Sequence, residues 1–115
     1  RMAAAVRPGR RMAISAFSAY FQVRFLDEGD SFDAASGVNH ERTTLKSPEQ
    51  RRMDAELWTS CFTPRELRLL ADRAGLSVCG VWSVSPGDYR PRPPDLESPE
   101  YLLVAERPAA SPLGW

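Results

Sequence analysis

Three aromatic side chains, Phe17, Tyr20 and Phe21, stand close together near the start of the chain and could wall a binding pocket. Flat rings give a pocket its shape and exclude water at a small entropic cost, which suits a small organic ligand. The same spacing is also typical of core packing between a strand and the helix that follows it. Both interpretations stay open, and we take these three residues as the candidate substrate-binding residues.

No residue stands out as catalytic, and the single histidine, His40, is the one candidate. A neutral imidazole can accept a proton near pH 7, and Glu41 beside it is acidic. Adjacent side chains on a strand point to opposite faces, however, so these two residues are not expected to pair. A solvated histidine on a hairpin is the alternative interpretation.

A metal site could in principle be built from Asp30, Asp33, His40 and Glu41. It would require the acidic loop around residue 30 to fold back onto the histidine, with all four groups converging. Aspartates in such loops more often form turns or face solvent. We therefore expect no metal.

The composition excludes several classes of protein. A chain of 115 residues allows one domain at most, and 15 Lys+Arg balance 15 Asp+Glu. Zero net charge argues against a general nucleic-acid or membrane-surface binder, and no apolar run approaches the ~20 residues of a membrane span. Cys61 and Cys79 fit neither a disulfide scaffold nor a zinc site and have no activating base nearby, so we expect inert thiols and a cytoplasmic location.

The elements that would position the aromatic cluster are a strand and a short helix. Apolar residues on both faces of residues 11–17 predict a strand covered on two sides, as in a parallel sheet. Ser18 is the expected N-cap of the helix that follows, and the cluster spans this junction. In an open α/β sheet, ligands bind beyond the carboxyl ends of the strands, where this junction lies.

An insert of about residues 28–60 follows, and its part 28–45 could cover a site as a lid. Its first part, residues 27–36, is polar and predicts a loop, and two extended runs at 38–45 and 52–58 predict a β-hairpin around a Ser-Pro turn. Residues 53–57 would also fit a helical turn.

A helix is predicted from about residue 64 to 74 by signals at both ends. Thr63 and Glu66 have the spacing of a capping box, and Pro64 occupies the first helical position. Gly75 stands where a left-handed residue ends a helix. The expected buried stripe consists of residues with helical spacing: Leu67, Leu70, Ala71 and Ala74.

Two further strands complete the fold class. Residues 77–84 predict a strand with Val78, Trp82 and Val84 on one face, and residues 101–106 form a buried apolar run after a proline-rich excursion. We therefore expect an α/β protein with three sheet strands, two helices and an inserted hairpin. The first strand would be an exposed edge, which isolated proteins avoid, so self-association through it is possible.

The order of these segments resembles class I S-adenosylmethionine-dependent methyltransferases. Residues 2–21, MAAAVRPGRRMAISAFSAYF, are similar to the place where a helix ends in a Pro-Gly turn and enters the fifth strand. The stretches FDAASGVNHERTTL and LWTSCFTPRELRLLADRAGLSV resemble an inserted hairpin, the next helix and the sixth strand. The run PEYLLVAERP is similar to the seventh, antiparallel strand, which lies between the fifth and the sixth.

The resemblance implies that residues 1–108 are the C-terminal half of a Rossmann-like methyltransferase domain, with residues 109–115 as a tail. It implies S-adenosylmethionine as cofactor and a small-molecule methyl acceptor as partner. The seven glycines of the chain are isolated, so the glycine-rich cofactor turn of this family has no counterpart here and no cofactor-binding residue is expected. We therefore expect a methyltransferase fragment that is inactive alone. The alternative is a non-catalytic half-Rossmann protein that pairs through its exposed strand edge.

Overall fold

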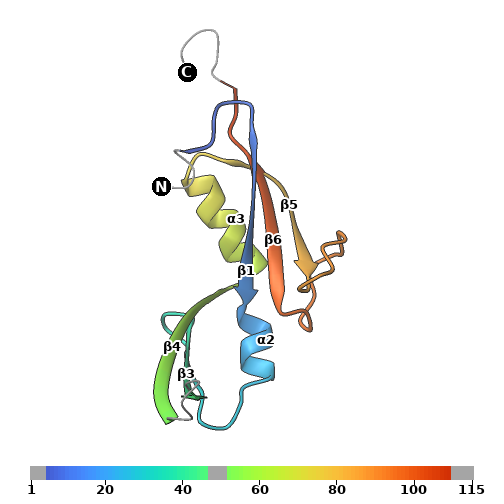
Figure 1. Ribbon diagram of the computed structural model, residues 1–115. Coiled ribbons are helices and arrows are strands. Elements are labelled where there is room, and N and C mark those ends of the chain that lie inside the picture. The colour runs from blue at the N-terminus through green and yellow to red at the C-terminus, as the bar shows by residue number, and fades with distance from the viewer. Residues whose placement is uncertain (1–4, 47–51, 110–115) are drawn as a thin grey trace.

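The computed structural model describes residues 5–46 and 52–109, and its elements alternate broadly as the sequence predicts (Figure 1). In chain order they are β1 (Arg11–Ser18), α2 (Ala19–Arg24), β2 (Ser31–Asp33), β3 (Val38–Lys46), β4 (Arg52–Phe62), α3 (Pro64–Arg73), β5 (Ser77–Val84) and β6 (Glu100–Glu106). The predicted turn between the hairpin strands and the tail after residue 109 lie outside the described residues. Within the described part of the chain, no helix has the length and apolar character needed to cross a membrane.

One six-stranded sheet runs through the molecule in the order β2-β3-β4-β1-β6-β5. Strand β6 lies antiparallel between β1 and β5, so β1 and β5 are parallel to each other. The α/β class and the antiparallel last strand are therefore confirmed. The number of sheet strands differs from the expected three, because the hairpin joins the sheet where β4 pairs with the end of β1.

The polar segment at residues 27–36 is not entirely a loop, since β2 within it pairs with β3. Gly37 makes this return possible: it has a φ of 71°, and its N–H donates to the carbonyl of Asp33 at 2.8 Å. Residues 53–57 belong to β4, which excludes the helical alternative for them.

Helix α3 has both of the predicted end structures. Thr63 Oγ1 accepts from the N–H of Glu66 at 3.2 Å, and the Glu66 carboxylate accepts from the N–H of Thr63 at 3.0 Å. At the other end Gly75 has a φ of 81°, and the N–H of Leu76 donates to the carbonyl of Ala71 at 2.9 Å. These bonds satisfy backbone groups that a helix end otherwise leaves unpaired.

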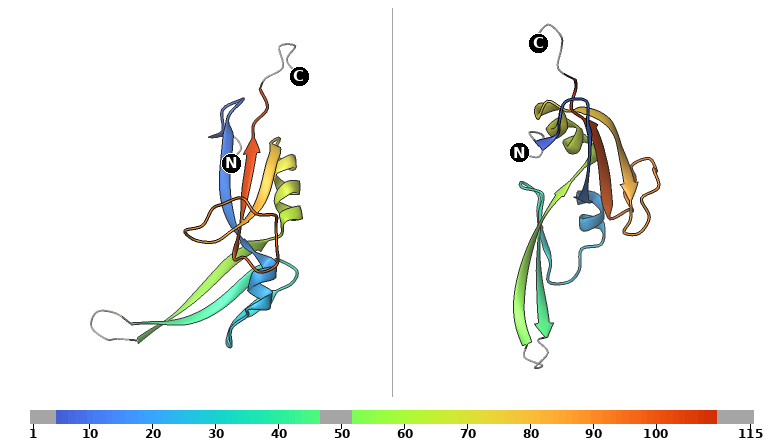
Figure 2. Two further views of the ribbon diagram at one scale, coloured as in Figure 1. Left: turned by 90° about the vertical axis from the view of Figure 1, so that its right-hand side faces the viewer. Right: turned by 45° about the horizontal axis from the view of Figure 1, so that its top comes forward.

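The core lies between α3 and one face of β1, β6 and β5, as the turned views show (Figure 2). Its buried members are Leu67, Ala71, Leu76, Val81, Tyr101, Leu103 and Ala105. A bulge between Val78 and Gly80 shifts the register of β5, so that Val78 and Val81 both face this core. The expectation that Val78 shares a face with Trp82 and Val84 is therefore wrong.

Strand β1 is less enclosed than its sequence predicts. On one edge it pairs with β6 from Arg11 to Phe17, but on the other it pairs with β4 only at Phe17 and Ser18. Its alternate residues Met12, Ile14 and Ala16 are half-buried, whereas the opposite face is exposed up to Phe17. The predicted open edge is thus present over Arg11–Ala16 in the described structure, while the predicted cover on both faces is absent there.

Candidate functional site

The junction between β1 and α2 is fixed by a buried serine. Ser18 is fully buried, and its Oγ accepts from the N–H of Phe21 at 3.2 Å as the N-cap of α2. Its own N–H donates to the carbonyl of Pro99 at 2.9 Å. These two bonds hold α2 beyond the carboxyl end of β1 and tie it to the proline-rich segment before β6.

The three predicted aromatic residues do not surround one cavity. Phe17 is 45% exposed and lines a groove between β1 and α3, whereas Tyr20 is 44% exposed and lines a second groove beside α2. Phe21 is half-buried, with its ring centroid 4.7 Å from that of Phe25. The three rings therefore lie in three different environments.

The second groove, which we call the α2 groove, has a volume of about 370 Å³ and is almost entirely apolar. It is lined by residues of α2 and one residue of the proline-rich segment: Ala19, Tyr20, Val23, Arg24 and Leu96. Arg24 places its guanidinium 3.6 Å from the carboxylate of Glu97, at the groove's charged side. A small apolar or aromatic molecule with a polar group fits such a surface.

Asp95 holds the wall of the α2 groove that carries Leu96. One carboxylate oxygen accepts from the N–H groups of Glu97 and Ser98 at 3.0 and 2.8 Å, and the other from Ser98 Oγ at 3.0 Å. Burial opposes ionisation, but these hydrogen bonds outweigh it and lower the pKa of Asp95. The Asp95 N–H donates to Ser83 Oγ at 2.8 Å, and the hydroxyl of the buried Tyr101 donates to the Asp95 carbonyl at 2.8 Å. The proline-rich segment is thus fastened to β5 and β6.

His40 lies on the hairpin and lines neither groove. Its ring stacks on Trp58, with centroids 4.8 Å apart and planes 9° apart, and its Nε2 lies 3.5 Å from Glu56 Oε1. The same Glu56 oxygen accepts from Arg42 Nε at 3.2 Å, while Nε2 is buried without a hydrogen bond. The acidic neighbour of His40 is therefore Glu56 across the strand pair, not Glu41 along the chain.

Sequence reasoning missed Glu56 and Trp58 as partners of His40. The antiparallel register places His40 opposite Trp58 and Arg42 opposite Glu56. These two partners could have been predicted only from the register of the hairpin strands. The sequence does not determine that register, because it contains no two-residue turn signature between them.

The other candidate groups are engaged locally. Asp33 accepts hydrogen bonds from Ser36 and from the N–H of Ala35, and these bonds lower its pKa. In residues 5–46 and 52–109 no group of three or more His, Cys, Asp or Glu side chains could hold a metal ion. Burial raises the pKa of the Cys61 thiol, and Cys79 is exposed.

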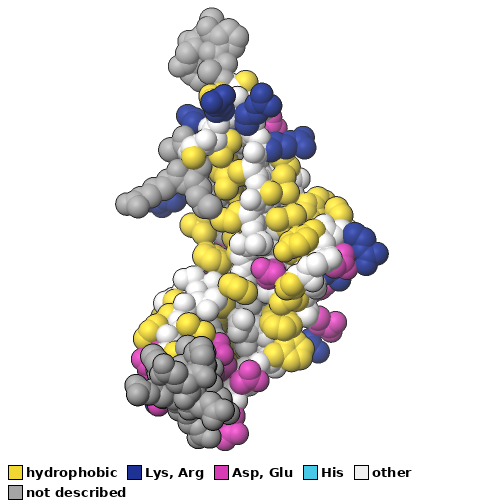
Figure 3. Space-filling model, viewed as in Figure 1, with side chains coloured by type: hydrophobic (Ala, Val, Ile, Leu, Met, Phe, Trp, Pro, Cys, Tyr) yellow, Lys and Arg dark blue, Asp and Glu magenta, His cyan; other side chains and the backbone are white. Residues whose placement is uncertain are grey.

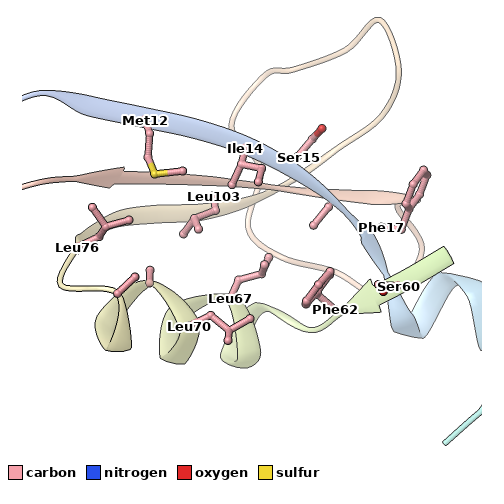
Figure 4. A pocket seen from close by; sticks show the side chains of 13 residues that line it. Met12, Ile14, Ser15, Phe17, Ser60, Phe62, Leu67, Leu70, Leu76 and Leu103 are labelled. Carbon is pink, nitrogen blue, oxygen red and sulfur yellow. The ribbon is translucent and has the colours of Figure 1, made fainter. Parts of the chain in front are cut away.

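The first groove, which we call the α3 groove, has a volume of about 480 Å³ (Figure 4). Met12 and Ile14 project into it from β1, and Leu67 and Leu70 come from α3. Contrary to the expected buried stripe, Leu70 is 51% exposed and Ala74 is also exposed, while Leu67 and Ala71 are buried. Half of the apolar face of α3 is therefore open to this groove.

The residues present do not fit S-adenosylmethionine. Close approach of a backbone to a cofactor usually requires glycine. The two strand-to-helix junctions of the described chain, residues 17–19 and 62–64, contain none. The glycines with positive φ lie singly in turns elsewhere. Neither junction therefore offers a glycine turn that a cofactor could approach closely.

Comparison with known proteins identifies solved structures that share this fold. No family model and no curated protein matches the sequence. Among solved structures, the CcbJ methyltransferase from Streptomyces caelestis is 18% identical with a TM-score of 0.66, and the match covers 90% of this chain and 45% of that chain. An S-adenosylmethionine-dependent methyltransferase from Clostridium acetobutylicum ATCC 824 is 11% identical with a TM-score of 0.61, over 90% of this chain and 46% of that one. The chain spans less than half the length of these structures, and it has the fold of that part of an S-adenosylmethionine-dependent methyltransferase.

Proposed function

We propose that this chain is the acceptor-side part of an S-adenosylmethionine-dependent methyltransferase and that its methyl acceptor is a small molecule. The observation that carries the proposal is the fold shared with two such enzymes over 90% of the chain. The cofactor would be held by residues outside this chain, so the chain alone would be inactive. A cytoplasmic location belongs to the same proposal.

The acceptor would bind beyond the carboxyl end of β1, where ligands of open α/β sheets bind. Of the three candidate residues, Tyr20 is the best placed, because it lines the α2 groove together with Leu96. Phe17 and Phe21 lie on either side of the same junction and would shape its approaches. The β3–β4 hairpin would act as a lid over this end of the sheet.

The contribution of this part of the enzyme would be chiefly to bind the acceptor. The cofactor, held by residues outside this chain, would supply an activated methyl group, and the part of this chain would be to hold the acceptor in position, which can provide much of a rate enhancement. In this chain the α2 groove would exclude water and Arg24 would orient a polar group of the acceptor. His40 would contribute no proton transfer unless the hairpin moves, since it lines neither groove.

The proposal is tested by acceptor binding to the purified chain. Ligand-observed NMR against small phenols, amines and carboxylic acids is expected to give hits that Tyr20→Ala weakens at least fivefold. Tyr89→Ala is the matched control, because Tyr89 is 54% exposed and lies outside the α2 groove. Equal loss of binding in both variants, or hits unaffected by Tyr20→Ala, would contradict an acceptor site at this groove.

The open edge of β1 favours a second candidate, a non-catalytic protein that pairs through this strand. Sedimentation equilibrium and calorimetric titration with S-adenosylmethionine distinguish the two. Strong self-association without acceptor binding would support the second candidate, and acceptor binding by a monomer would support the first.

A further inference from the structure

The α2 groove combines an apolar wall with one cationic side chain. Its lining consists of aliphatic side chains, one phenol and one guanidinium: Ala19, Val23, Leu96, Tyr20 and Arg24. Val23 and Leu96 are each 55% exposed, so the apolar wall is open to a ligand. In the space-filling view, apolar side chains gather around α2 with acidic and basic side chains beside them (Figure 3). A surface of this kind selects a ligand by one charge and by shape.

The guanidinium of Arg24 is held beside this wall by two weak contacts. Its central carbon lies 5.8 Å from the centroid of the Phe25 ring, within the range of a cation–π contact. Its Nη1 lies 3.6 Å from Glu97 Oε1. That distance exceeds the roughly 2.7–3.2 Å of an N–H···O hydrogen bond, so this ion pair is not hydrogen-bonded. The donor fork of Arg24 can therefore take a stronger anionic partner.

Glu97 can release Arg24 without disturbing the groove. Its N–H donates to Asp95 Oδ1 at 3.0 Å, and Asp95 also accepts from the N–H and the hydroxyl of Ser98. These bonds, and not the contact with Arg24, hold the segment that carries Leu96. The Glu97 side chain is 72% exposed, so its carboxylate can turn into solvent, and an exposed pair of this kind contributes little free energy. Glu97 thus occupies the place that the carboxylate of a ligand would take.

We propose that the α2 groove binds a small carboxylic acid with an apolar or aromatic body, whose carboxylate displaces that of Glu97 from Arg24. That this acid is the methyl acceptor rests on the proposed function, whereas the site itself rests on the groove. A ligand carboxylate can accept two parallel N–H bonds from the guanidinium, and such charge-assisted bonds are short and strong. The body of the ligand covers Val23 and Leu96 and excludes water from the new ion pair, which strengthens it further.

Other ligand chemistries use only part of this surface. The ammonium group of an amine would approach Arg24, whose like charge repels it, and would compete with Arg24 for Glu97. A neutral molecule could cover the apolar wall but would leave Arg24 with its weak partner. A carboxylate is the group to which both the charge and the wall contribute.

Two probes of the same shape but different charge test the proposal, namely naphthylacetic acid and its primary amide. The chain is purified from the organism that encodes it, together with any polypeptide that stays bound to it. Saturation-transfer NMR titrations at neutral pH measure both affinities. We expect the acid to bind about tenfold more tightly than the amide. Tyr20→Ala should weaken both probes equally, because the ring contacts the body that they share.

Three variants show which charges cause the preference. Arg24→Gln should lower the affinity for the acid to that for the amide, and unchanged binding of the amide checks that the groove is intact. Glu97→Gln should tighten binding of the acid about threefold, because it removes a competing carboxylate from an exposed pair. Arg90→Gln is the matched control and should change neither affinity, because Arg90 is also an exposed arginine paired with a carboxylate, that of Asp88, but it does not line the groove.

Equal binding of the acid and the amide, weaker binding of the acid to Glu97→Gln, or equal losses in Arg24→Gln and Arg90→Gln would each overturn the proposal, as would binding of neither probe. Equal binding of both probes that depends on Tyr20 would overturn the preference for a carboxylate but leave the proposed function standing. Methyl transfer from labelled S-adenosylmethionine is measured separately. Binding of the acid that depends on Arg24, without transfer to any acceptor, would refute the proposed function and leave the carboxylate site.

Discussion

Leu67 and Leu70 are one helical turn apart on α3 but differ tenfold in exposure, at 5% and 51%. Replacing each by alanine in the isolated chain should therefore have unequal effects on the free energy of unfolding. Leu67→Ala opens a cavity in the core and should cost about 3 kcal/mol, within the roughly 2–5 kcal/mol observed for buried leucines. Leu70→Ala removes a side chain that is only half covered, and should cost about 1 kcal/mol or less.

Urea denaturation followed by circular dichroism measures the difference. A domain of this size has a stability of about 5–15 kcal/mol, so Leu67→Ala removes a large share of it while Leu70→Ala shifts the midpoint slightly. Leu69→Ala is the control for helix propensity, because Leu69 is 60% exposed outside the groove. Its effect should be no more than about 0.5 kcal/mol.

Equal costs for Leu67→Ala and Leu70→Ala would refute the reasoning. Leu70 would then be covered in the isolated chain, and the α3 groove would not be open. If the cost of Leu70→Ala grew with protein concentration, a second copy of the chain would be covering the groove.

Three further changes test local features. Thr63→Ala removes the capping box and should destabilise the chain by about 1 kcal/mol in urea denaturation, with Thr63→Ser close to the original; equal losses would exclude the hydroxyl as the cause. Gly37→Ala forces a φ of 71° on alanine and brings its Cβ to 3.2 Å from a carbonyl oxygen of β4. The Cβ of Gly29→Ala meets nothing within 4 Å. Thermal unfolding should therefore show a larger loss of stability for Gly37→Ala than for Gly29→Ala. Hydrogen bonding from Arg90 lowers the pKa of Asp88 from 3.8 to about 2, so the Asp88 contribution to stability is present above 3.8 and lost as the pH falls through 2. Asp88→Asn should therefore flatten the pH dependence of unfolding in that window, and an unchanged acid limb would contradict this pairing.

The features that the sequence predicted well are those whose causes are local. The capping box of Thr63 and Glu66, the left-handed Gly75 and the N-cap Ser18 each involve residues at most five apart, and all are present in the structure. Their backbone bonds form from neighbours alone, so no knowledge of the fold was required.

The features that the sequence missed depend on pairing between distant segments. The bulge at Gly80 turns Trp82 away from the face that carries Val78, and it shows only in the register between β5 and β6. The partners of His40 depend likewise on the register of β3 against β4. A shift of one residue reverses every face of a strand, so alternation within a strand cannot settle these contacts.

The candidate site was predictable only in its location. The carboxyl end of β1 follows from the strand-to-helix junction at Ser18, and Tyr20 does line a groove there. That Tyr20 alone of the three rings lines this groove could not be foreseen, because Leu96, which lines it with Tyr20, is far away in the sequence. Its placement depends on the Asp95 hydrogen bonds and on the return of the chain into β6.

The mismatch between the sequence of β1 and its observed exposure carries information of its own. Residues 11–17 have the two-sided apolar pattern of a strand enclosed in a parallel sheet, yet Ala13 and Phe17 are exposed in the described structure and Met12 and Ile14 are only half-buried. The strand forms because β6 pairs with it from Arg11 to Phe17, so the two-sided apolar pattern is not needed to make these residues a strand. The apolar residues on the exposed face of β1 are explained if this strand is enclosed more fully in the functional protein. The open edge and the half-covered stripe of α3 therefore coincide with a strand whose sequence is more apolar than its observed surroundings require.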